Sequence, residues 1–406
     1  MKRNDRLDRL AEFPFRRLAA LLARVPAPAG PTLDLALGEP KHAPPALLAE
    51  TVAAHGHLWN RYPPVNGTAE FRAAAAGWLT RRFELPPDAV DPERHVLPLA
   101  GTKEGLYLLP SVLVPGTTTA AVPAVLMPDP VYAVYYGAAV MAGAEPVLLP
   151  ASAATGFLPD LDAIAPTLLE RTALLYLCSP ANPQGAVADL DYLHRAVRLA
   201  RRYGFVLAVD ECYSELWDVA PPPGALSAAL ADGGSLDNVV VFHSLSKRSS
   251  AAGLRSGFVA GDASVLGPLL RLRAYAAPVQ PLPLLAAATA LWGDEAHVEA
   301  NRALYRAKFD LAQRRLGNRF GFYRPAGGFF LWLDVGDGEA AARRLWAEAG
   351  VRVLPGGYLS LGEVGGSNAG APYIRVALVD EITTVDRALG RLADLLGEAG
   401  PVGSAP

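Results

Sequence analysis

Cysteine is scarce in this chain, since Cys178 and Cys212 are the only two among 406 residues. Their spacing matches neither a disulfide framework nor a metal-ligand motif. We expect both to be small core residues of a reduced protein, and we expect no metal site. Reduced thiols of this kind are typical of a cytoplasmic protein.

Long apolar runs are also missing. Pro, Gly or a charged residue interrupts every apolar stretch before it reaches the length of a membrane span. The first residues carry charges such as Arg3, Asp5 and Arg6 in place of the apolar core of a signal peptide. The formal net charge of -3 gives no reason to expect an anionic partner. We therefore expect no nucleic-acid partner and no membrane partner.

The composition that is present belongs to a folded protein, with 51% hydrophobic and 19% charged residues. The length favours two domains over one compact core. From changes in pattern we predict an N-terminal arm over 1–45 that is part of the small domain, and a large domain over 46–280. An interdomain helix and the C-terminal small domain follow over 281–406.

Strands and helices alternate in the large domain. The expected strands cover 96–99, 121–127, 146–149, 173–178, 205–209, 238–242 and 258–260, and the expected helices cover 104–112, 132–141, 161–170 and 190–203. Strands that are apolar on both faces and alternate with helices indicate an α/β fold with a mainly parallel sheet covered on both sides. Ligands of such sheets bind beyond the carboxyl ends of the strands.

The pattern changes after residue 280. We expect a long helix through 284–291 and 298–316, strands at 329–335 and 374–378, and helices at 339–349 and 382–396. The Gly-rich stretch 354–371 is predicted to be a long loop that is functional or mobile. Within the predicted helix that begins at 104, Pro110 predicts a kink.

The segment after the predicted strand 238–242 contains Ser244, Lys247 and Arg255. A lysine at a strand end can form a Schiff base with an aldehyde cofactor when burial and neighbouring cations lower its pKa. Ser244 and Arg255 then suit an anionic group, most simply the phosphate of that cofactor. Taken alone, the segment fits a surface loop with one solvated lysine equally well.

Other strand ends carry polar or aromatic groups. Gly101, Thr102 and Lys103 open a helix, where free backbone N–H groups attract phosphate, although a simple Thr N-cap explains them too. Tyr132 can stack on a flat ring or pack in the core. Asn182, between two prolines, can point its amide into the cleft or form only a rigid turn.

Asp210 follows five consecutive apolar residues. A carboxylate at that position is unfavourable unless a cation pairs with it. A protonated pyridine nitrogen is such a cation, and Tyr213 can reach the phenolic oxygen of the same ring. A helix-capping aspartate is the alternative interpretation.

In this order and at this spacing, these groups resemble the fold-type I pyridoxal-phosphate aminotransferases of class I/II, from residue 33 to residue 396. The resemblance implies pyridoxal 5'-phosphate as cofactor, and a seven-stranded, mainly parallel sheet between helices with a smaller α/β domain beside it. It implies that Lys247 binds the cofactor and moves the substrate proton, while Asp210 pairs with the ring nitrogen. The other implied cofactor contacts are Tyr132 on the ring face, Asn182 and Tyr213 on the ring oxygen, and Gly101, Thr102, Lys103 (through its backbone), Ser244 and Arg255 on the phosphate.

The same resemblance implies substrates and a partner. Arg375 would bind the α-carboxylate of an amino acid or 2-oxo acid, assisted by the Gly38 backbone and by Asn182. Tyr62 matches a tyrosine that reaches the phosphate of the other subunit, which implies a homodimer with sites at the interface.

Several stretches resemble the succinyldiaminopimelate transaminases of bacterial lysine synthesis: 12–15, 37–42, 178–180, 210–215, 242–249 and 295–298. This implies amino transfer between N-succinyl-LL-2,6-diaminopimelate and 2-oxoglutarate. The alternatives are an aminotransferase for aspartate, N-acetylornithine or an aromatic amino acid, and a pyridoxal-phosphate β-lyase. The effector domain of a transcription regulator is a further alternative, which would need an attached DNA-binding segment.

Some residues depart from the family pattern or have no role in it. Gln184 replaces a usual Thr and Leu254 replaces a common Trp. We expect His243 to be a packed strand histidine and His42 to be at most a residue at the mouth of the site. We expect Arg248 to be solvated, with contact to a distal substrate carboxylate as the alternative.

Overall fold

The computed structural model describes residues 3–116, 121–276, 279–364 and 367–397. Residues 365–366 of the predicted Gly-rich loop and residues 398–406 of the predicted small domain lie outside these ranges. Within them, no helix is long and apolar enough to cross a membrane.

Seven strands form one sheet in the order β2-β8-β7-β6-β5-β3-β4. They are β2 (Val96–Leu99), β3 (Ala124–Asp129), β4 (Glu145–Pro150), β5 (Thr172–Cys178), β6 (Val206–Asp210), β7 (Val239–Ser244) and β8 (Gly257–Gly261). Neighbours from β4 to β7 pair in parallel, and β8 is antiparallel to both β7 and β2. The predicted α/β class with a mainly parallel seven-stranded sheet is confirmed.

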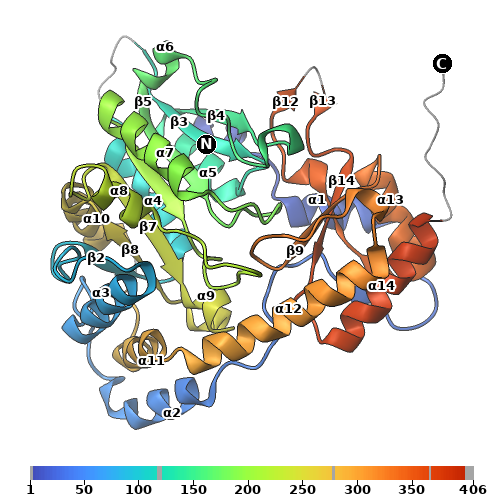
Figure 1. The fold of residues 1–406 in the computed structure, drawn as a ribbon, viewed down its shortest axis with the longest axis horizontal. Helices are drawn as coiled ribbons and strands as arrows, with labels where there is room; N and C mark the ends of the chain where they lie inside the picture. Colours follow the sequence, from blue (N-terminus) through green and yellow to red (C-terminus); the bar gives the residue numbers. More distant parts are fainter. Residues whose placement is uncertain (1–2, 117–120, 277–278, 365–366, 398–406) are drawn as a thin grey trace.

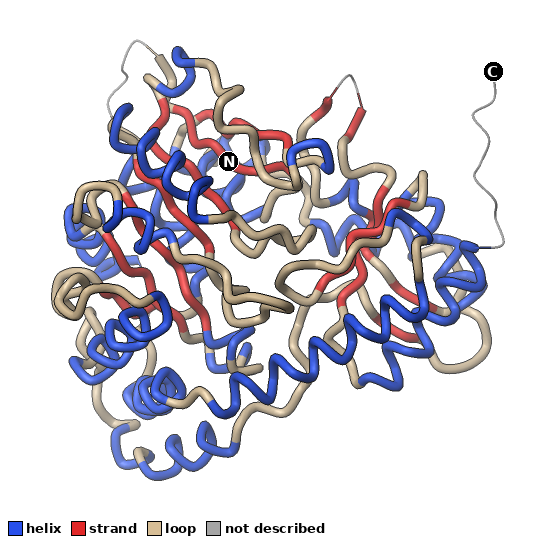
Figure 2. Tube along the Cα trace, viewed as in Figure 1, coloured by secondary structure: helices blue, strands red, loops and turns tan. Residues whose placement is uncertain are grey.

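Helices cover both faces of this sheet (Figure 2). In β7, Val239 and Val241 pack into one hydrophobic core, while Val240 and Phe242 pack into another on the opposite face. The first core includes residues of α3 (Ala69–Phe83), α7 (Leu190–Tyr203), α8 (Ala225–Ala231) and α11 (Leu282–Gly293). The second includes residues of α4 (Thr102–Leu113), α5 (Ala133–Ala142) and α10 (Ala263–Ala276). Such two-sided burial explains why these strands are apolar throughout.

A separate core joins the two ends of the chain. It includes residues of α1 (Pro14–Leu22), β1 (Leu33–Asp34), β9 (Phe330–Asp334), α13 (Gly338–Arg344), β10 (Val351–Arg352), β11 (Leu354–Pro355), β14 (Tyr373–Ala377) and α14 (Ile382–Gly397). In it β1 pairs with β10, and β14 lies between β11 and β9. The long helix α12 (Ala296–Leu316) runs from the large sheet to this second unit (Figure 1). The predicted boundaries at 45/46 and 280/281 stay predictions.

Some predicted elements differ in extent. The helix predicted over 161–170 is only α6 (Pro166–Leu169), because Pro166 fixes the first helical position and disfavours helical backbone at Ala165. The predicted long helix is two helices, α11 and α12, separated near Asp294. The helix predicted over 339–349 is α13 followed by a π-helical turn over Leu345–Ala349.

Pro110 lies inside α4. A proline there removes the N–H that would donate to the Leu106 carbonyl. The Tyr176 hydroxyl donates to that carbonyl at 2.5 Å instead. The sheet thus supplies the hydrogen bond that the helix lacks.

Candidate active site

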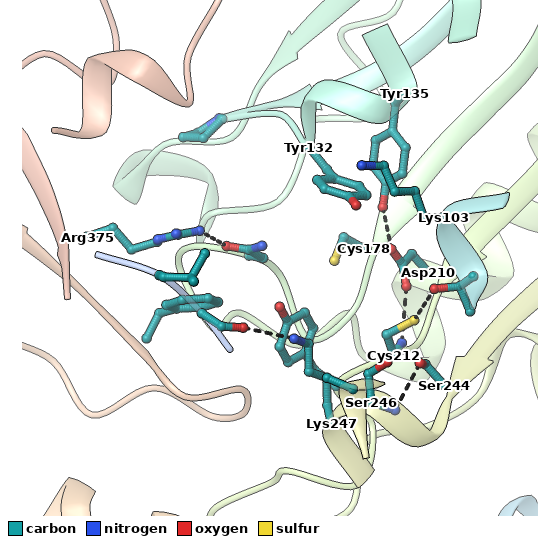
Figure 3. Close-up of a pocket in the computed structure, with 18 of the residues that line it drawn as sticks. Lys103, Tyr132, Tyr135, Cys178, Asp210, Cys212, Ser244, Ser246, Lys247 and Arg375 are labelled. Carbon is teal, nitrogen blue, oxygen red and sulfur yellow. Dashed lines mark hydrogen bonds between the residues drawn. The ribbon is translucent and has the colours of Figure 1, made fainter. Parts of the chain in front are cut away.

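A cavity of about 290 Å³ lies where the predicted strand ends meet β14 and the segment after β1 (Figure 3). Eleven of the thirteen predicted site residues line it: Gly38, Thr102, Lys103, Tyr132, Asn182, Asp210, Tyr213, Ser244, Lys247, Arg255 and Arg375. Gly101 lies directly behind Arg255, since a Cβ at Gly101 would collide with that guanidinium. Tyr62 does not line the cavity and is fully exposed.

Lys247 lies on the short helix α9 (Leu245–Arg248), which begins where β7 ends. Ser244 caps this helix, because its hydroxyl oxygen accepts the Ser246 N–H at 3.1 Å. The Lys247 ammonium donates to the Gly38 carbonyl at 2.9 Å. Burial lowers the pKa of Lys247 to about 8, and the charges of Arg375 and Arg255 add to this effect. A neutral, nucleophilic amine is therefore accessible near neutral pH.

Gly38 is required by close packing. A Cβ at this position would collide with the Phe330 ring. The segment after β1 can therefore bring its carbonyl to Lys247 only with glycine here.

Asp210 is a buried carboxylate at the end of β6. The Tyr135 hydroxyl donates to its Oδ2 at 2.7 Å, and the Cys212 N–H donates to its Oδ1 at 3.2 Å. Burial raises the pKa of Asp210 despite these two donors. A cation facing Asp210 would stabilise the charged form of its carboxylate.

The cavity also includes residues that were not predicted as site residues, among them Tyr135, Cys178 and Cys212. The Cys212 thiol lies 3.1 Å from the Thr102 hydroxyl, and the Cys178 thiol donates to the Pro180 carbonyl at 3.3 Å. Both thiols are free, and burial raises the pKa of each. Their position in the sequence could have identified both cysteines as site residues, because each lies at or just after the end of a strand.

Hydrogen-bond donors gather at the end of the cavity near the start of α4. Thr102 begins that helix after Gly101, whose φ of 82° favours glycine. The hydroxyls of Ser244 and Ser246 and the guanidinium of Arg255 line the same cavity. A helix N-terminus, hydroxyls and an arginine together are a donor set for phosphate.

Arg375, on β14, is a buried cation. Its guanidinium donates to the Asn182 side-chain oxygen at 3.1 Å and to the Ala36 carbonyl at 2.9 Å, while Nε has no partner. Among the described residues no carboxylate pairs with it, and burial lowers its pKa to about 10. A carboxylate ligand would supply the missing negative charge.

Three residues for which the sequence predicts no catalytic role lie in different surroundings. His243 is buried against the Trp78 and Phe258 rings, as predicted. His42 does not line the cavity. The prediction for Arg248 was wrong, because it is 1% exposed and its guanidinium packs on Trp292.

The family model "Aminotransferase class I and II" matches residues 31–392 of the chain. The chain belongs to this family. An aminotransferase structure from Neisseria meningitidis is similar at 38% identity and a TM-score of 0.92, covering 97% of this chain and 100% of that one. A structure of a probable N-succinyldiaminopimelate aminotransferase from Thermus thermophilus matches at 26% identity and a TM-score of 0.81, covering 94% and 99%.

Two curated relatives have named reactions. LL-diaminopimelate aminotransferase of Desulforudis audaxviator is 34% identical over 97% of both chains. The 4-dedimethylamino-4-oxo-anhydrotetracycline transaminase OxyQ of Streptomyces rimosus is 36% identical over 94% of this chain and 99% of its own. The chain is thus a pyridoxal-phosphate-dependent aminotransferase.

The cavity fits this cofactor. Buried Asp210 suits the protonated ring nitrogen, and the donors around Thr102 and Arg255 suit the phosphate. Of the other cavity residues, Lys247 suits the cofactor aldehyde and Arg375 suits a substrate carboxylate. When bound, pyridoxal phosphate supplies an electron sink that makes the α-proton of an amino acid acidic. The chain's own residues have to bind and orient the substrate and to move that proton.

Proposed function

We propose that the chain transfers the amino group of N-succinyl-LL-2,6-diaminopimelate to 2-oxoglutarate, in diaminopimelate and lysine biosynthesis. The observation that carries this proposal is the distribution of charge along the cavity. Four cations line it: Lys103, Lys247, Arg255 and Arg375. One carboxylate, Asp210, lines it among the described residues.

Two of the cations are available to substrate. We assign Lys247 to the cofactor aldehyde and Arg255 to its phosphate, so Arg375 and Lys103 remain. Among the described residues no carboxylate forms an ion pair with Lys103, and its ammonium lies 5.7 Å from the centre of the Phe13 ring. A substrate with a second carboxylate, as in the succinylated donor and in glutamate, matches this pair of cations.

The shortage of carboxylates supports an acylated donor. The free LL-diaminopimelate molecule carries a second ammonium group, which would need an acceptor of negative charge at the far end of the cavity. Asp210 is assigned to the cofactor, and the cavity wall otherwise includes Phe13, Phe15, Leu37 and Pro130. An amide nitrogen, which is neutral, avoids the cost of burying an unpaired ammonium there.

LL-diaminopimelate itself is the second candidate donor. The specific support is the name of the Desulforudis audaxviator relative. Both candidates share the same reacting end and the same contact with Arg375. They differ in the charge on the distal nitrogen.

We assign the remaining site residues as follows. Lys247 moves the proton between the substrate α-carbon and the cofactor carbon, and Tyr132 packs on the cofactor ring. Asn182 and Tyr213 bond the ring oxygen, and Arg375 with the Gly38 backbone orients the substrate carboxylate. Thr102, Ser244 and the backbone of Gly101 and Lys103 join Arg255 at the phosphate.

We further propose that the enzyme is a cytoplasmic homodimer. The support for a dimer is Tyr62, an aromatic side chain that is fully exposed in the single chain. An aromatic ring in such a position is typical of an interface. In the dimer, Tyr62 would complete the phosphate site of the partner subunit.

The test is a 2-oxoglutarate-coupled assay with N-succinyl-LL-2,6-diaminopimelate, LL-diaminopimelate, N-acetylornithine, an aromatic amino acid and aspartate. We expect the highest kcat/KM with the succinylated donor. A higher value with LL-diaminopimelate would favour the second candidate, and a preference for any of the others would contradict both. Release of pyruvate and ammonia from a thioether amino acid without a 2-oxo acid would indicate a β-lyase.

Lys103→Met tests the assignment of charge. We expect kcat/KM for the succinylated donor to fall about tenfold, because a hydrogen bond to a charged group is lost. The value for N-acetylornithine, which has one carboxylate, should change less. Arg198→Met is the control, since Arg198 pairs with Asp232 on the surface at 2.9 Å and neither residue lines the cavity.

A further inference from the structure

Three of the stretches that sequence analysis singled out meet around α9, the helix that carries Lys247. Arg248 donates to Glu295 at 2.6 Å and to the Leu291 carbonyl at 2.7 Å. The Ser249 hydroxyl lies 2.8 Å from His297 Nε2. The segments 242–249 and 295–298 are therefore in direct contact, and 37–42 joins them through His42. The proposed reaction uses Gly38, Ser244 and Lys247 from these segments and gives no role to the contacts of Arg248, Ser249 and His42.

Asn301, on α12, binds the main chain of α9 directly. Its side-chain nitrogen donates to the carbonyls of Lys247 and Arg248, at 3.0 and 3.2 Å. Because the Asn301 nitrogen donates to two carbonyls, the positions of the nitrogen and the oxygen of this amide are determined. The Asn301 oxygen must then face its other neighbour, His42, as an acceptor.

His42 completes a chain of three polar side chains. Its Nδ1 lies 2.9 Å from the Asn301 oxygen, so Nδ1 must carry a proton. Its Nε2 lies 2.7 Å from the Lys308 ammonium, so Nε2 must be the acceptor. The imidazole is thus neutral and in a single tautomer, and its ring lies 4.7 Å from that of Tyr305.

The same histidine is tied to the segment of Gly38. The Ser250 hydroxyl donates to the His42 carbonyl at 2.7 Å, and four residues earlier in the chain the Gly38 carbonyl accepts from Lys247. The segment 38–42 and the segment 247–250 therefore hold each other at both ends. Movement of His42 would therefore disturb both segments, and with them the contact between the Gly38 carbonyl and the Lys247 ammonium.

Burial is the main reason why His42 stays in its neutral form. Burial lowers the pKa of His42, and it also lowers that of Lys308, to about 8. The hydrogen bond to Asn301 opposes this effect on His42, the Lys308 charge adds to it, and the Glu381 charge opposes it. Asp380 and Glu381 favour the charged form of Lys308, and Lys41 disfavours it.

We propose that His42 and Asn301 are positioning residues for Lys247, and that the neutral imidazole, held by Lys308, orients the amide that fixes the main chain of α9. This role is independent of the amino donor, so it goes beyond the proposed function. Apolar side chains could pack α9 against α12 without the cost of burying the three polar side chains of Asn301, His42 and Lys308. Their hydrogen bonds are directional, and they therefore specify the position of Lys247.

The test compares three variants of the cofactor-bound enzyme. His42→Phe removes both ring hydrogen bonds and keeps an aromatic ring beside Tyr305. His42→Gln can still donate to Asn301 and accept from Lys308. His57→Phe is the control, because His57 is exposed and outside this network.

We expect His42→Phe to lower kcat by about tenfold to a hundredfold, since small misplacements of a catalytic group have effects of this size. The donor KM should stay within about twofold, because Arg375 is untouched. After removal of the cofactor, the midpoint of the pH dependence of its rebinding rate should move upward, since water reaching the Lys247 amine relieves the burial that favours its neutral form. His42→Gln should restore kcat and the midpoint to near the parent values.

Asn301→Asp keeps the proposal testable if His42→Phe fails to fold. It preserves the shape of the side chain and removes the donor to the two carbonyls, so the same loss of kcat and the same shift of midpoint are expected. A folded His42→Phe or Asn301→Asp enzyme with parental kcat and midpoint would overturn the proposal. So would a His42→Gln enzyme as impaired as His42→Phe.

Discussion

At the scale of single residues, burial sets the chemistry of the site. It lowers the pKa of Lys247 to about 8 and that of Arg375 to about 10, and it raises the pKa of Asp210. In each case the charged form is disfavoured until a partner arrives. These buried groups therefore favour binding of an anionic substrate and of a cofactor with a cationic ring nitrogen.

The pKa of Lys247 predicts how fast the cofactor-free enzyme binds pyridoxal phosphate at each pH. Only the neutral amine attacks an aldehyde, so the rate should rise with pH through about 8 and then level off. Stopped-flow absorbance measures this rate. A rate that keeps rising toward the ordinary lysine value of 10.5 would show that burial does not act on this amine.

Tyr135→Phe tests the buried hydrogen bond to Asp210. The change leaves one carboxylate oxygen without its donor, which has an effect of about 1–3 kcal/mol. The pKa of Asp210 should rise further, and the dissociation constant of pyridoxal phosphate should increase, because a protonated carboxyl no longer pairs with the ring nitrogen. Fluorescence titration measures that constant. Tyr136→Phe, which removes the next hydroxyl along the chain, should bind like the parent.

The residues that bear charge were predictable from sequence because polar side chains directly follow apolar strands. Lys247, Asp210 and Arg375 were identified in this way or by resemblance. Tyr135 was missed because its partner Asp210 is 75 residues away. Arg248 was placed in solvent because its burial depends on Trp78 and Trp292, which come from distant helices.

At the scale of elements, the strands were predictable because burial on both faces makes them apolar throughout. The ends of the helices were harder to predict. The start of α6 follows from Pro166, but the break between α11 and α12 places the Glu295 side chain against Arg248, a tertiary contact that no local pattern shows. The stretch 354–371 was expected to be a loop, and it contains the short strands β11, β12 (Glu363–Val364) and β13 (Ser367–Asn368).

Asp129 holds part of this stretch against the large sheet. Its carboxylate accepts from the Ser360 hydroxyl at 2.7 Å and from the N–H groups of Leu361 and Gly362 at 3.1 and 3.3 Å. The neighbouring residues Pro128 and Pro130 line the active-site cavity. The carboxylate therefore connects the loop to the wall of the site.

Asp129→Ala should release this loop. Three hydrogen bonds to a charged group are lost, so the backbone amides of 359–362 should exchange with deuterium about tenfold faster or more. The donor KM should rise, because the cavity wall loosens. Ser360→Ala removes one of the three bonds and should have a smaller effect on both. Unchanged exchange in Asp129→Ala would contradict this account of the loop.

At the scale of the whole molecule, residues of the site come from the large sheet and from the unit that joins the two chain ends. Gly38 and Arg375 come from the unit that joins the two chain ends, while Asp210, Lys247 and the phosphate donors come from the large sheet. The alternation of elements was enough to predict the α/β class. It could not show that residues before 45 pack with residues after 330, because no local pattern encodes that contact.

The proposed dimer predicts complementation between subunits. Tyr62→Ala should weaken cofactor binding about tenfold, through the lost hydrogen bond to phosphate, and Lys247→Ala should abolish activity. A hybrid of one Tyr62→Ala and one Lys247→Ala subunit should regain one intact site, with parental cofactor affinity. A hybrid without recovered affinity, or a fully active monomer, would contradict the proposed role of Tyr62.

The most direct test of the central claim is to find which lysine holds the cofactor. The chain has five lysines: Lys2, Lys41, Lys103, Lys247 and Lys308. Borohydride reduction of the cofactor-bound enzyme makes the lysine–cofactor bond permanent, and peptide mapping by mass spectrometry then locates the modified residue. We predict modification at Lys247, and we predict that Lys247→Ala loses the visible cofactor absorbance. Modification at Lys103 or Lys308 would contradict the whole assignment of the site.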